Sequence, residues 1–244
     1  MGKHKLERFE AIKSFSNVMQ YPPNMPGKWD AFFGNQHPIT LELGCGRGEY
    51  SVGLARMYPE GNFIGMDIKG DRIWKGAKTA LEEGLKNVAF IRSQIEQVAN
   101  YFAPAEISDI WITFPDPQLR SSKMKKRLTH PRFLRLYQQF LAQKGRVHLK
   151  TDSPDLYNFT KAVIELYELT LITDYDDIYG LDKADEILSI KTHYEGLDIA
   201  GVQKVHYLCF QLDKPLPLDK DKVLRALFDA VEKQADEQAD KIRQ

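Results

Sequence analysis

The sequence predicts an α/β fold with a mostly parallel β-sheet whose two faces are covered by helices. Strand-like and helix-like apolar patterns alternate from residue 38 to about residue 212, and repeated strand–helix units favour parallel strands. The composition of 244 residues, 43% apolar and 28% charged, suffices for one large core. A glycine-rich loop follows the first strand, which is where open sheets of this class bind ligands.

The elements of this fold follow in order from the spacing of apolar residues. Short apolar runs predict seven strands, and helical spacing predicts the intervening helices. Gly84 ends one helix, Pro131 suits the first turn of another, and Ser153 followed by proline is a helix-start signal. The predicted strands are 39–43, 62–67, 87–91, 109–114, 146–151, 169–174 and 202–212, and the predicted helices are 50–57, 71–83, 95–102, 131–141, 154–167 and 218–244.

The same pattern predicts the domain organisation. Residues 1–37 are expected to form an N-terminal extension, in which helical spacing over 6–19 is broken by a proline-rich stretch. Residues 38–215 would form the main domain, and 216–244 a C-terminal helix. No apolar run approaches the roughly 20 residues that span a bilayer, and no secretory signal is visible. Two cysteines make no disulfide framework, so we expect a cytoplasmic protein without a membrane partner.

The charge of the chain is balanced overall but uneven along it. Equal numbers of Lys+Arg and Asp+Glu, 34 of each, argue against a globally basic nucleic-acid binder. From residue 117 to 151, however, there are ten basic residues and no acidic one. Such a block can neutralise phosphates, although an isolated basic run is more often a solvated loop. The six histidines have no metal-ligand spacing, so no metal is expected.

The glycine loop is the first candidate site. Gly44, Gly46 and Gly48 stand between the first strand and the first helix, where glycine allows positive φ and close approach of a ligand. Glu49 takes the place where a dinucleotide-binding loop needs its third glycine. Asp67 ends the second strand, where a carboxylate can accept hydrogen bonds from ribose hydroxyls. A tight turn with a helix-capping acid is the alternative, but the combination favours a nucleoside-type cofactor.

The second candidate site follows the fourth predicted strand. Two prolines flank Asp116 in Phe-Pro-Asp-Pro and stiffen the loop that carries this carboxylate. The basic block begins directly afterwards. Its members nearest the loop are candidates for phosphate contacts: Arg120, Lys123, Lys125, Lys126 and Arg127.

These motifs together resemble a known family. The glycine loop preceded by Glu42 is similar to that of S-adenosylmethionine-dependent methyltransferases of class I. The Phe-Pro-Asp-Pro motif, the basic stretch, the segments 127–134 and 148–152, and Thr192-His-Tyr-Glu195 resemble the bacterial tRNA (guanine-N7-)-methyltransferase (TrmB) family over about residues 35–212. The chain departs from the family at Gln118 and Leu119, where Trp-Pro is usual, and at Gln94, where an acid is common.

The resemblance implies a Rossmann-like class I methyltransferase that transfers a methyl group from S-adenosylmethionine to N7 of the guanine at tRNA position 46. It implies cofactor contacts by Glu42, Gly44, Gly46, Gly48, Asp67, Ser93, Gln94 and Asp116. Asp116 would also be catalytic, and Asp152, Thr192 and Glu195 would join the basic residues in binding the substrate. Asp152 could instead simply start a helix, and Thr192 and Glu195 could lie in an exposed loop. A methyltransferase with another substrate and an inactive RNA-binding relative remain alternatives, and the chain could be a monomer or a homodimer.

Overall fold

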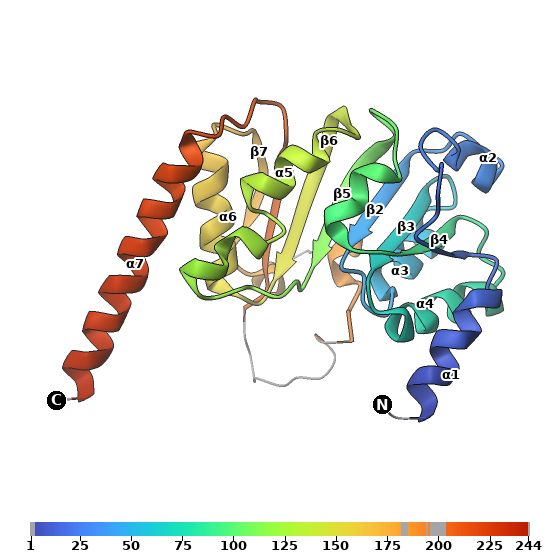
Figure 1. Ribbon diagram of the computed structural model, residues 1–244, viewed down its shortest axis with the longest axis horizontal. Coiled ribbons are helices and arrows are strands. Elements are labelled where there is room, and N and C mark those ends of the chain that lie inside the picture. Colours follow the sequence, from blue (N-terminus) through green and yellow to red (C-terminus); the bar gives the residue numbers. More distant parts are fainter. Residues whose placement is uncertain (1–2, 182–184, 194, 196–203, 244) are drawn as a thin grey trace.

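One mixed sheet of eight strands organises the molecule (Figure 1). The computed structural model describes residues 3–181, 185–193, 195 and 204–243. The strand order is β1-β4-β3-β2-β5-β6-β8-β7, and β8 is antiparallel to both of its neighbours. The strands are β1 (Val18–Gln20), β2 (Ile39–Leu43), β3 (Asn62–Asp67), β4 (Val88–Arg92), β5 (Ile107–Thr113), β6 (Leu141–Thr151), β7 (Leu171–Tyr175) and β8 (His206–Gln211).

Helices connect the strands, and short 3-10 segments fill several of the links. The α-helices are α1 (Lys3–Ala11), α2 (Trp29–Phe33), α3 (Glu49–Met57), α4 (Gly70–Glu82), α5 (Pro131–Tyr137), α6 (Pro154–Leu166) and α7 (Lys220–Arg243). The 3-10 segments are η1 (Ile12–Ser14), η2 (Ile95–Asn100), η3 (Ser121–Lys126), η4 (Ile178–Gly180) and η5 (Glu186–Ser189). None of the described helices is both long enough and apolar enough to cross a membrane.

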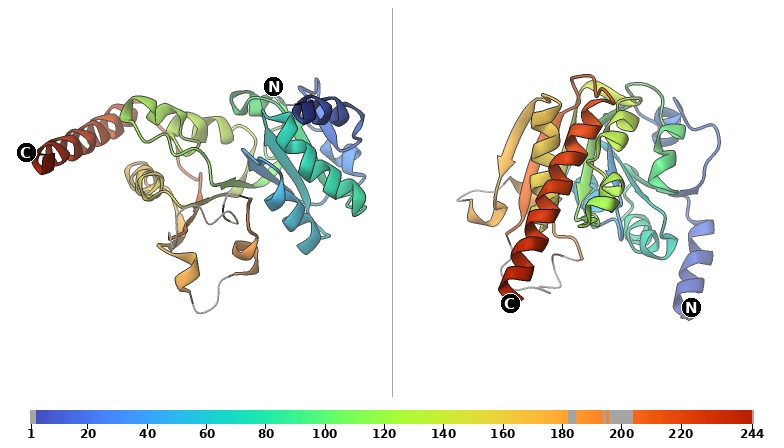
Figure 2. Two further views of the ribbon diagram at one scale, coloured as in Figure 1. Left: turned by 90° about the horizontal axis from the view of Figure 1, so that it is seen from below. Right: turned by 60° about the vertical axis from the view of Figure 1, so that its left-hand side comes forward.

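Two hydrophobic cores lie on opposite faces of the sheet because successive strand residues point to opposite sides. On one face, alternate strand residues such as Leu41 and Ile112 pack with side chains from α2, η2, α5, α6 and α7. On the other face, Phe90 and Trp111 pack with α3, α4 and the segment that holds η4 and η5. The left view of Figure 2 shows the molecule from below, with helices on both sides of the sheet. The predicted, mostly parallel sheet with helices on both faces is confirmed.

The parallel strands β4, β3, β2, β5 and β6 end at the same edge of the sheet. Asp67 is the last residue of β3, and the other strands are followed directly by the glycine loop, Ser93, the Phe114–Gln118 loop and Asp152. The topology therefore gathers nearly every candidate residue at one edge, which we call the carboxyl edge. It is the lower edge in Figure 1.

The N-terminal segment is built differently from the prediction. The helix expected over 6–19 ends at Ala11, and Val18–Gln20 forms an eighth strand parallel to β4. Without it, the backbone groups of β4 would form an unpaired edge. Trp29 is fully buried, and its indole N–H donates to the carbonyl of Tyr101 at 2.8 Å. Residues before 38 thus contribute both a strand and a core side chain.

The other elements lie within a few residues of their predicted bounds. The main differences are β6, which begins at Leu141 where the end of a helix was expected, and β8, which begins at His206. Residues 202 and 203, the predicted start of that last strand, lie outside the described part of the chain.

Candidate functional site

The glycine loop combines one tightly packed glycine with one open glycine. Gly44, Gly46 and Gly48 have φ of 72°, 54° and 71°. A Cβ on Gly48 would lie 2.5 Å from a ring carbon of Phe90, whereas a Cβ on Gly46 would meet nothing within 4 Å. Gly48 therefore packs the loop against the core. Gly46 borders open space, so a ligand can come close to the backbone there.

Asp67 joins this loop to the end of β3. One carboxylate oxygen accepts the Gly46 N–H at 2.9 Å, and the other accepts the Lys69 N–H at 2.8 Å. A carboxylate has about four acceptor positions, so each oxygen keeps capacity for another donor. These free acceptor positions fit the two hydroxyls of a ribose, which is the contact that the sequence analysis expects of Asp67.

Glu42 occupies a different place from the one expected of a cofactor contact. Its side chain is buried under the loop at 2% exposure. One oxygen accepts the N–H and the hydroxyl of Ser51, at 2.9 and 2.5 Å, and the other accepts the hydroxyl of Thr113 at 2.8 Å. Glu42 thus ties β2 to α3 and to the end of β5, and it supports the site from below.

Burial raises the pKa of the Glu42 carboxyl from 4.5 to about 7, against the opposing effect of its hydrogen bonds to Ser51 and Thr113. The folded protein therefore holds this proton more tightly than the unfolded chain. The stability that the proton contributes is present at low pH and is lost between about pH 4.5 and pH 7.

We expect Glu42→Gln to be more stable than the wild type at pH 8 and to lose this advantage at pH 5. The glutamine amide can donate to Thr113 and its carbonyl can accept from Ser51, so the hydrogen bonds survive while the buried charge is removed. The pKa shift of Glu42 corresponds to a difference of about 3 kcal/mol in the free energy of unfolding at pH 8. Urea unfolding at both pH values measures it, with the exposed-site variant Glu96→Gln as the control. Equal stability differences at pH 5 and pH 8 would contradict the expectation.

Ser93 and Gln94, two of the expected cofactor contacts, differ in exposure. Ser93 is fully buried, and its hydroxyl lies 2.7 Å from the Tyr101 hydroxyl. Its N–H donates to the carbonyl of Asp67 at 3.1 Å, which links the ends of β3 and β4. The Gln94 side chain is exposed at the start of η2 and is the member of the pair that is open to a ligand.

Asp116 lies on a loop with unusual backbone geometry. The non-glycine residues Phe114 and Gln118 have φ of 45° and 49°, and they flank the Pro115–Pro117 segment. Residues in such sparsely populated conformations are concentrated at functional sites. The Asp116 side chain is exposed, and one of its oxygens accepts the Gln118 N–H at 3.1 Å. The loop therefore presents a carboxylate outward at the carboxyl edge.

The five candidate cations nearest Asp116 divide into an exposed set and one buried member. The side chains open to a polyanion are Arg120, Lys123, Lys125 and Lys126. Arg127 is 3% exposed, so the expected phosphate contact is wrong for this residue. Its guanidinium donates to the carbonyls of Pro117, Gln118 and Leu119 at 3.1 to 3.3 Å and lies 4.4 Å from the ring centre of Phe159.

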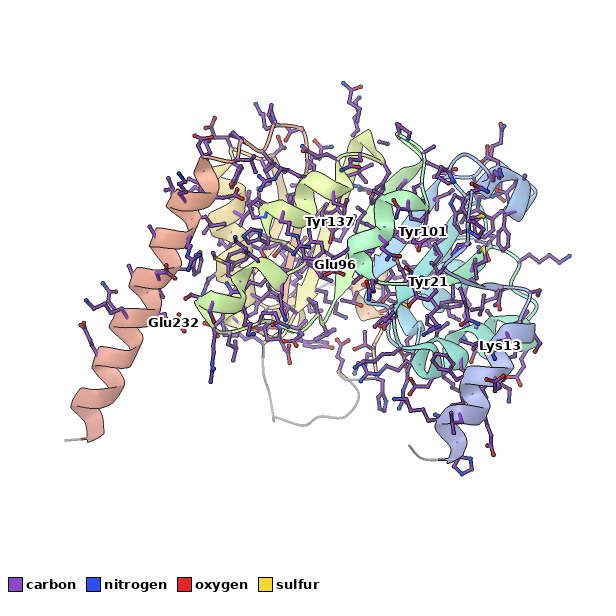
Figure 3. All side chains as sticks on the ribbon, in the orientation of Figure 1. Lys13, Tyr21, Glu96, Tyr101, Tyr137 and Glu232 are labelled. Carbon is purple, nitrogen blue, oxygen red and sulfur yellow. The ribbon has the colours of Figure 1, made fainter. Side chains whose placement is uncertain are left out.

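Arg127 therefore braces the loop that carries Asp116. The segment η3 that precedes Arg127 is also fixed from outside, because the Ser121 N–H donates to Glu232 of α7 at 3.2 Å. Figure 3 shows Glu232 where α7 passes this segment.

The three remaining candidates split in the same way. Asp152 is exposed directly after β6. Thr192 and Glu195 are largely buried and bind each other: the Thr192 N–H donates to the Glu195 carboxylate at 3.2 Å, and the Glu195 N–H donates to the Thr192 hydroxyl at 3.3 Å. Glu195 also pairs with Lys150, a fully buried lysine that sequence reasoning did not single out.

Among the described residues, no group of His, Cys, Asp and Glu is arranged to hold a metal ion. The site at the carboxyl edge has three parts. They are the glycine loop with Asp67, the strained loop with the exposed Asp116 carboxylate, and the exposed basic side chains that follow it.

Comparisons with known proteins agree with this architecture. A family model described as "Putative methyltransferase" matches residues 36–206. In fold, the chain is similar to the crystal structure of the 16S rRNA methyltransferase KamB, with a TM-score of 0.57, 14% identity, and coverage of 77% of this chain and 93% of that one. Fold and site thus define a methyltransferase of class I.

The sequence relatives are more specific. The chain is 48% identical to the tRNA (guanine-N(7)-)-methyltransferase of Bacteroides thetaiotaomicron over 87% of both chains. It is 50% identical to the enzyme of the same name from Porphyromonas gingivalis, over 84% of this chain and 88% of that one. The chain belongs to the tRNA (guanine-N7-)-methyltransferase family, as the sequence motifs predicted.

Proposed function

We propose that the protein transfers a methyl group from S-adenosylmethionine to N7 of a guanine in tRNA, at position 46 of the variable loop. The observation that carries the proposal is the carboxyl edge itself. It places a nucleoside-type loop with Asp67 at the same edge as the Asp116 loop, and the exposed basic block directly follows that loop in the chain. The relatives that share up to half of the residues carry the same activity in their names.

The residues at the carboxyl edge fit S-adenosylmethionine. Gly46 leaves room beside the backbone, Asp67 keeps acceptor capacity for ribose hydroxyls, and Gln94 offers an exposed amide to an adenine edge. When bound, the cofactor supplies an electrophilic methyl group attached to a positively charged sulfur. Gly44, Gly46, Gly48, Asp67 and Gln94 would hold it, while Glu42 and Ser93 would support them from the protein interior.

The reaction needs little acid–base catalysis by the protein. Guanine N7 carries a lone pair and no proton, so no residue has to remove one. The protein must align the two reactants for in-line attack, which can lower a barrier by several kcal/mol. Positive charge passes to the guanine ring during transfer, and a fixed carboxylate nearby stabilises it. Asp116, aimed outward by the strained loop, is the residue that we assign to this role, and Asp152 is the remaining exposed acceptor for the N–H groups of guanine.

The exposed lysines of η3 are expected to provide most of the salt-sensitive affinity for tRNA. Replacing Lys123, Lys125 and Lys126 together by alanine should weaken tRNA binding and reduce the slope of log affinity against log salt by about 2. Fluorescence anisotropy between 50 and 300 mM salt would measure this slope. The control is the triple alanine variant of Lys28, Lys86 and Lys214, which are exposed outside the basic segment that follows Asp116. An unchanged slope in the η3 variant would contradict the assignment.

One assay tests the function itself. The protein is incubated with labelled S-adenosylmethionine and tRNA that lacks modifications, and N7-methylguanosine is mapped along the product. Methyl transfer to the variable-loop guanine is the expected result. Transfer to another nucleotide or to no tRNA at all would favour a different methyltransferase substrate, and tRNA binding without transfer would favour an RNA-binding relative.

We also propose that the protein works in the cytoplasm as a monomer or homodimer. Its two cysteines are both free and buried, which suits a reducing compartment. Sedimentation with and without tRNA would establish the number of copies in the complex.

A further inference from the structure

A fully buried cation stands at the end of β6. The ammonium group of Lys150 donates to the carbonyls of Leu188 and Ile190 at 2.9 and 3.0 Å. It also lies 3.0 and 3.1 Å from the two carboxylate oxygens of Glu195. Because an unpaired charge in the interior is very costly, a lysine without exposure is kept only where partners surround it. All of these partners come from one segment, residues 186–195.

Three donors meet the Glu195 carboxylate in this arrangement. One N–H of the Lys150 ammonium, the Tyr179 hydroxyl and the N–H of Thr192 donate to it. The ammonium has three N–H groups, and the other two donate to the carbonyls of Leu188 and Ile190. The Glu195 side chain is only 4% exposed. The carboxylate therefore lies inside the protein, held by Lys150, Tyr179 and Thr192.

The segment that Lys150 holds packs on the helix that follows the glycine loop. The Tyr50 hydroxyl donates to the carbonyl of Ile187 at 2.5 Å. Ile190 fills the space above Gly53, where a Cβ would come within 3.0 Å of it. Lys150 therefore joins the end of β6 to a segment that packs on α3, the helix directly after the glycine loop.

We propose that Lys150 is a positioning residue for methyl transfer, that it fixes residues 186–193 and Glu195 at the carboxyl edge, and that Glu195 serves as its anchor. The proposal rests on the proposed function, because the kinetic test measures tRNA methylation. In this proposal Lys150 and Glu195 act together, so removing either partner should release the same segment, residues 186–193.

The test compares Lys150→Met, Glu195→Gln and the double variant. Each single variant should lower kcat for tRNA methylation by about 10²-fold, the loss typical of a small misplacement of reacting groups, and leave the KM for S-adenosylmethionine within a few-fold. The double variant should lose no more than the singles, because partners in one unit are not additive. It also removes both buried charges, so it keeps the test available if a single variant folds poorly. Losses that multiply in the double variant would overturn the proposal.

A second readout does not depend on activity. Hydrogen exchange of the amides in 186–193 should become faster in Lys150→Met, while the β5–β6 ladder stays protected. The matched control is Lys161→Met, which removes a half-exposed lysine of α6 that pairs with Asp174 of β7. Unchanged exchange in Lys150→Met would overturn the anchoring role by itself, whereas a wild-type protein that methylates no tRNA would overturn the proposed function.

Discussion

Replacing Asp116 by alanine is expected to lower kcat for tRNA methylation by about 10²- to 10³-fold, the cost of removing one preorganised electrostatic contact. The affinity for tRNA should change little, because the exposed lysines of η3 are untouched. The carboxylate is exposed and makes one hydrogen bond, to the Gln118 N–H, so its loss should leave the fold intact. Single-turnover rates with saturating protein would isolate the transfer step.

Two further variants make the Asp116 experiment decisive. Asp116→Asn keeps the shape and the acceptor for Gln118 but removes the charge, so it should show most of the loss if charge stabilisation matters. Glu165→Ala removes an exposed carboxylate on α6 and should behave as the wild type. A folded Asp116→Ala protein with the wild-type transfer rate would remove Asp116 from the mechanism.

The second large effect is expected at Gly76, in the middle of α4. A Cβ at this position would lie 2.4 Å from the carbonyl oxygen of Arg47, 3.0 Å from the Phe90 ring and 3.1 Å from the Cα of Gly48. Helix α4 therefore touches the glycine loop through two glycines. We expect Gly76→Ala to push the helix and the loop apart, to destabilise the protein by about 1–3 kcal/mol, and to weaken binding of S-adenosylmethionine at least tenfold.

Helix propensity by itself predicts the opposite sign for this substitution, since alanine in a helix is favoured over glycine by about 1 kcal/mol. A net loss in urea unfolding, together with weaker binding in calorimetry, would therefore identify the contact with the loop as the cause. Lys75→Ala, at the preceding and exposed position of α4, is the control. A Gly76→Ala protein that is as stable as the wild type and binds the cofactor equally well would contradict the expectation.

Local signals in the sequence predicted most of the sheet and its helices. The strands 39–43 and 62–67 are observed with the predicted bounds, because short apolar runs and turn residues specify them locally. The order of the strands and the role of Val18–Gln20 could not be predicted in this way. A three-residue edge strand has too little periodicity to identify, and its position depends on the free edge of β4.

The sequence predicts the positions of site residues that lie at strand ends. It does not predict the contacts that side chains make with distant segments. The glycine loop and Asp67 follow from their positions at strand ends, which the pattern gives. The buried positions of Glu42, Arg127 and Glu195 depend on partners from distant segments: Thr113, the 117–119 carbonyls and Lys150. Charge alone predicts an exposed ligand contact for such residues. Only the fold reveals that they hold loops in place.

Helices α1 and α7 both extend beyond the carboxyl edge, at opposite ends of the sheet, as two views agree (Figures 1 and 2). The first and last turns of the chain consequently lie on the side that would face a tRNA. A purification tag or reporter protein attached at either end would enter the space of a large substrate and could lower the measured affinity by itself. A label on Lys86, in the exposed turn before β4, would sit at the opposite edge and leave that space clear.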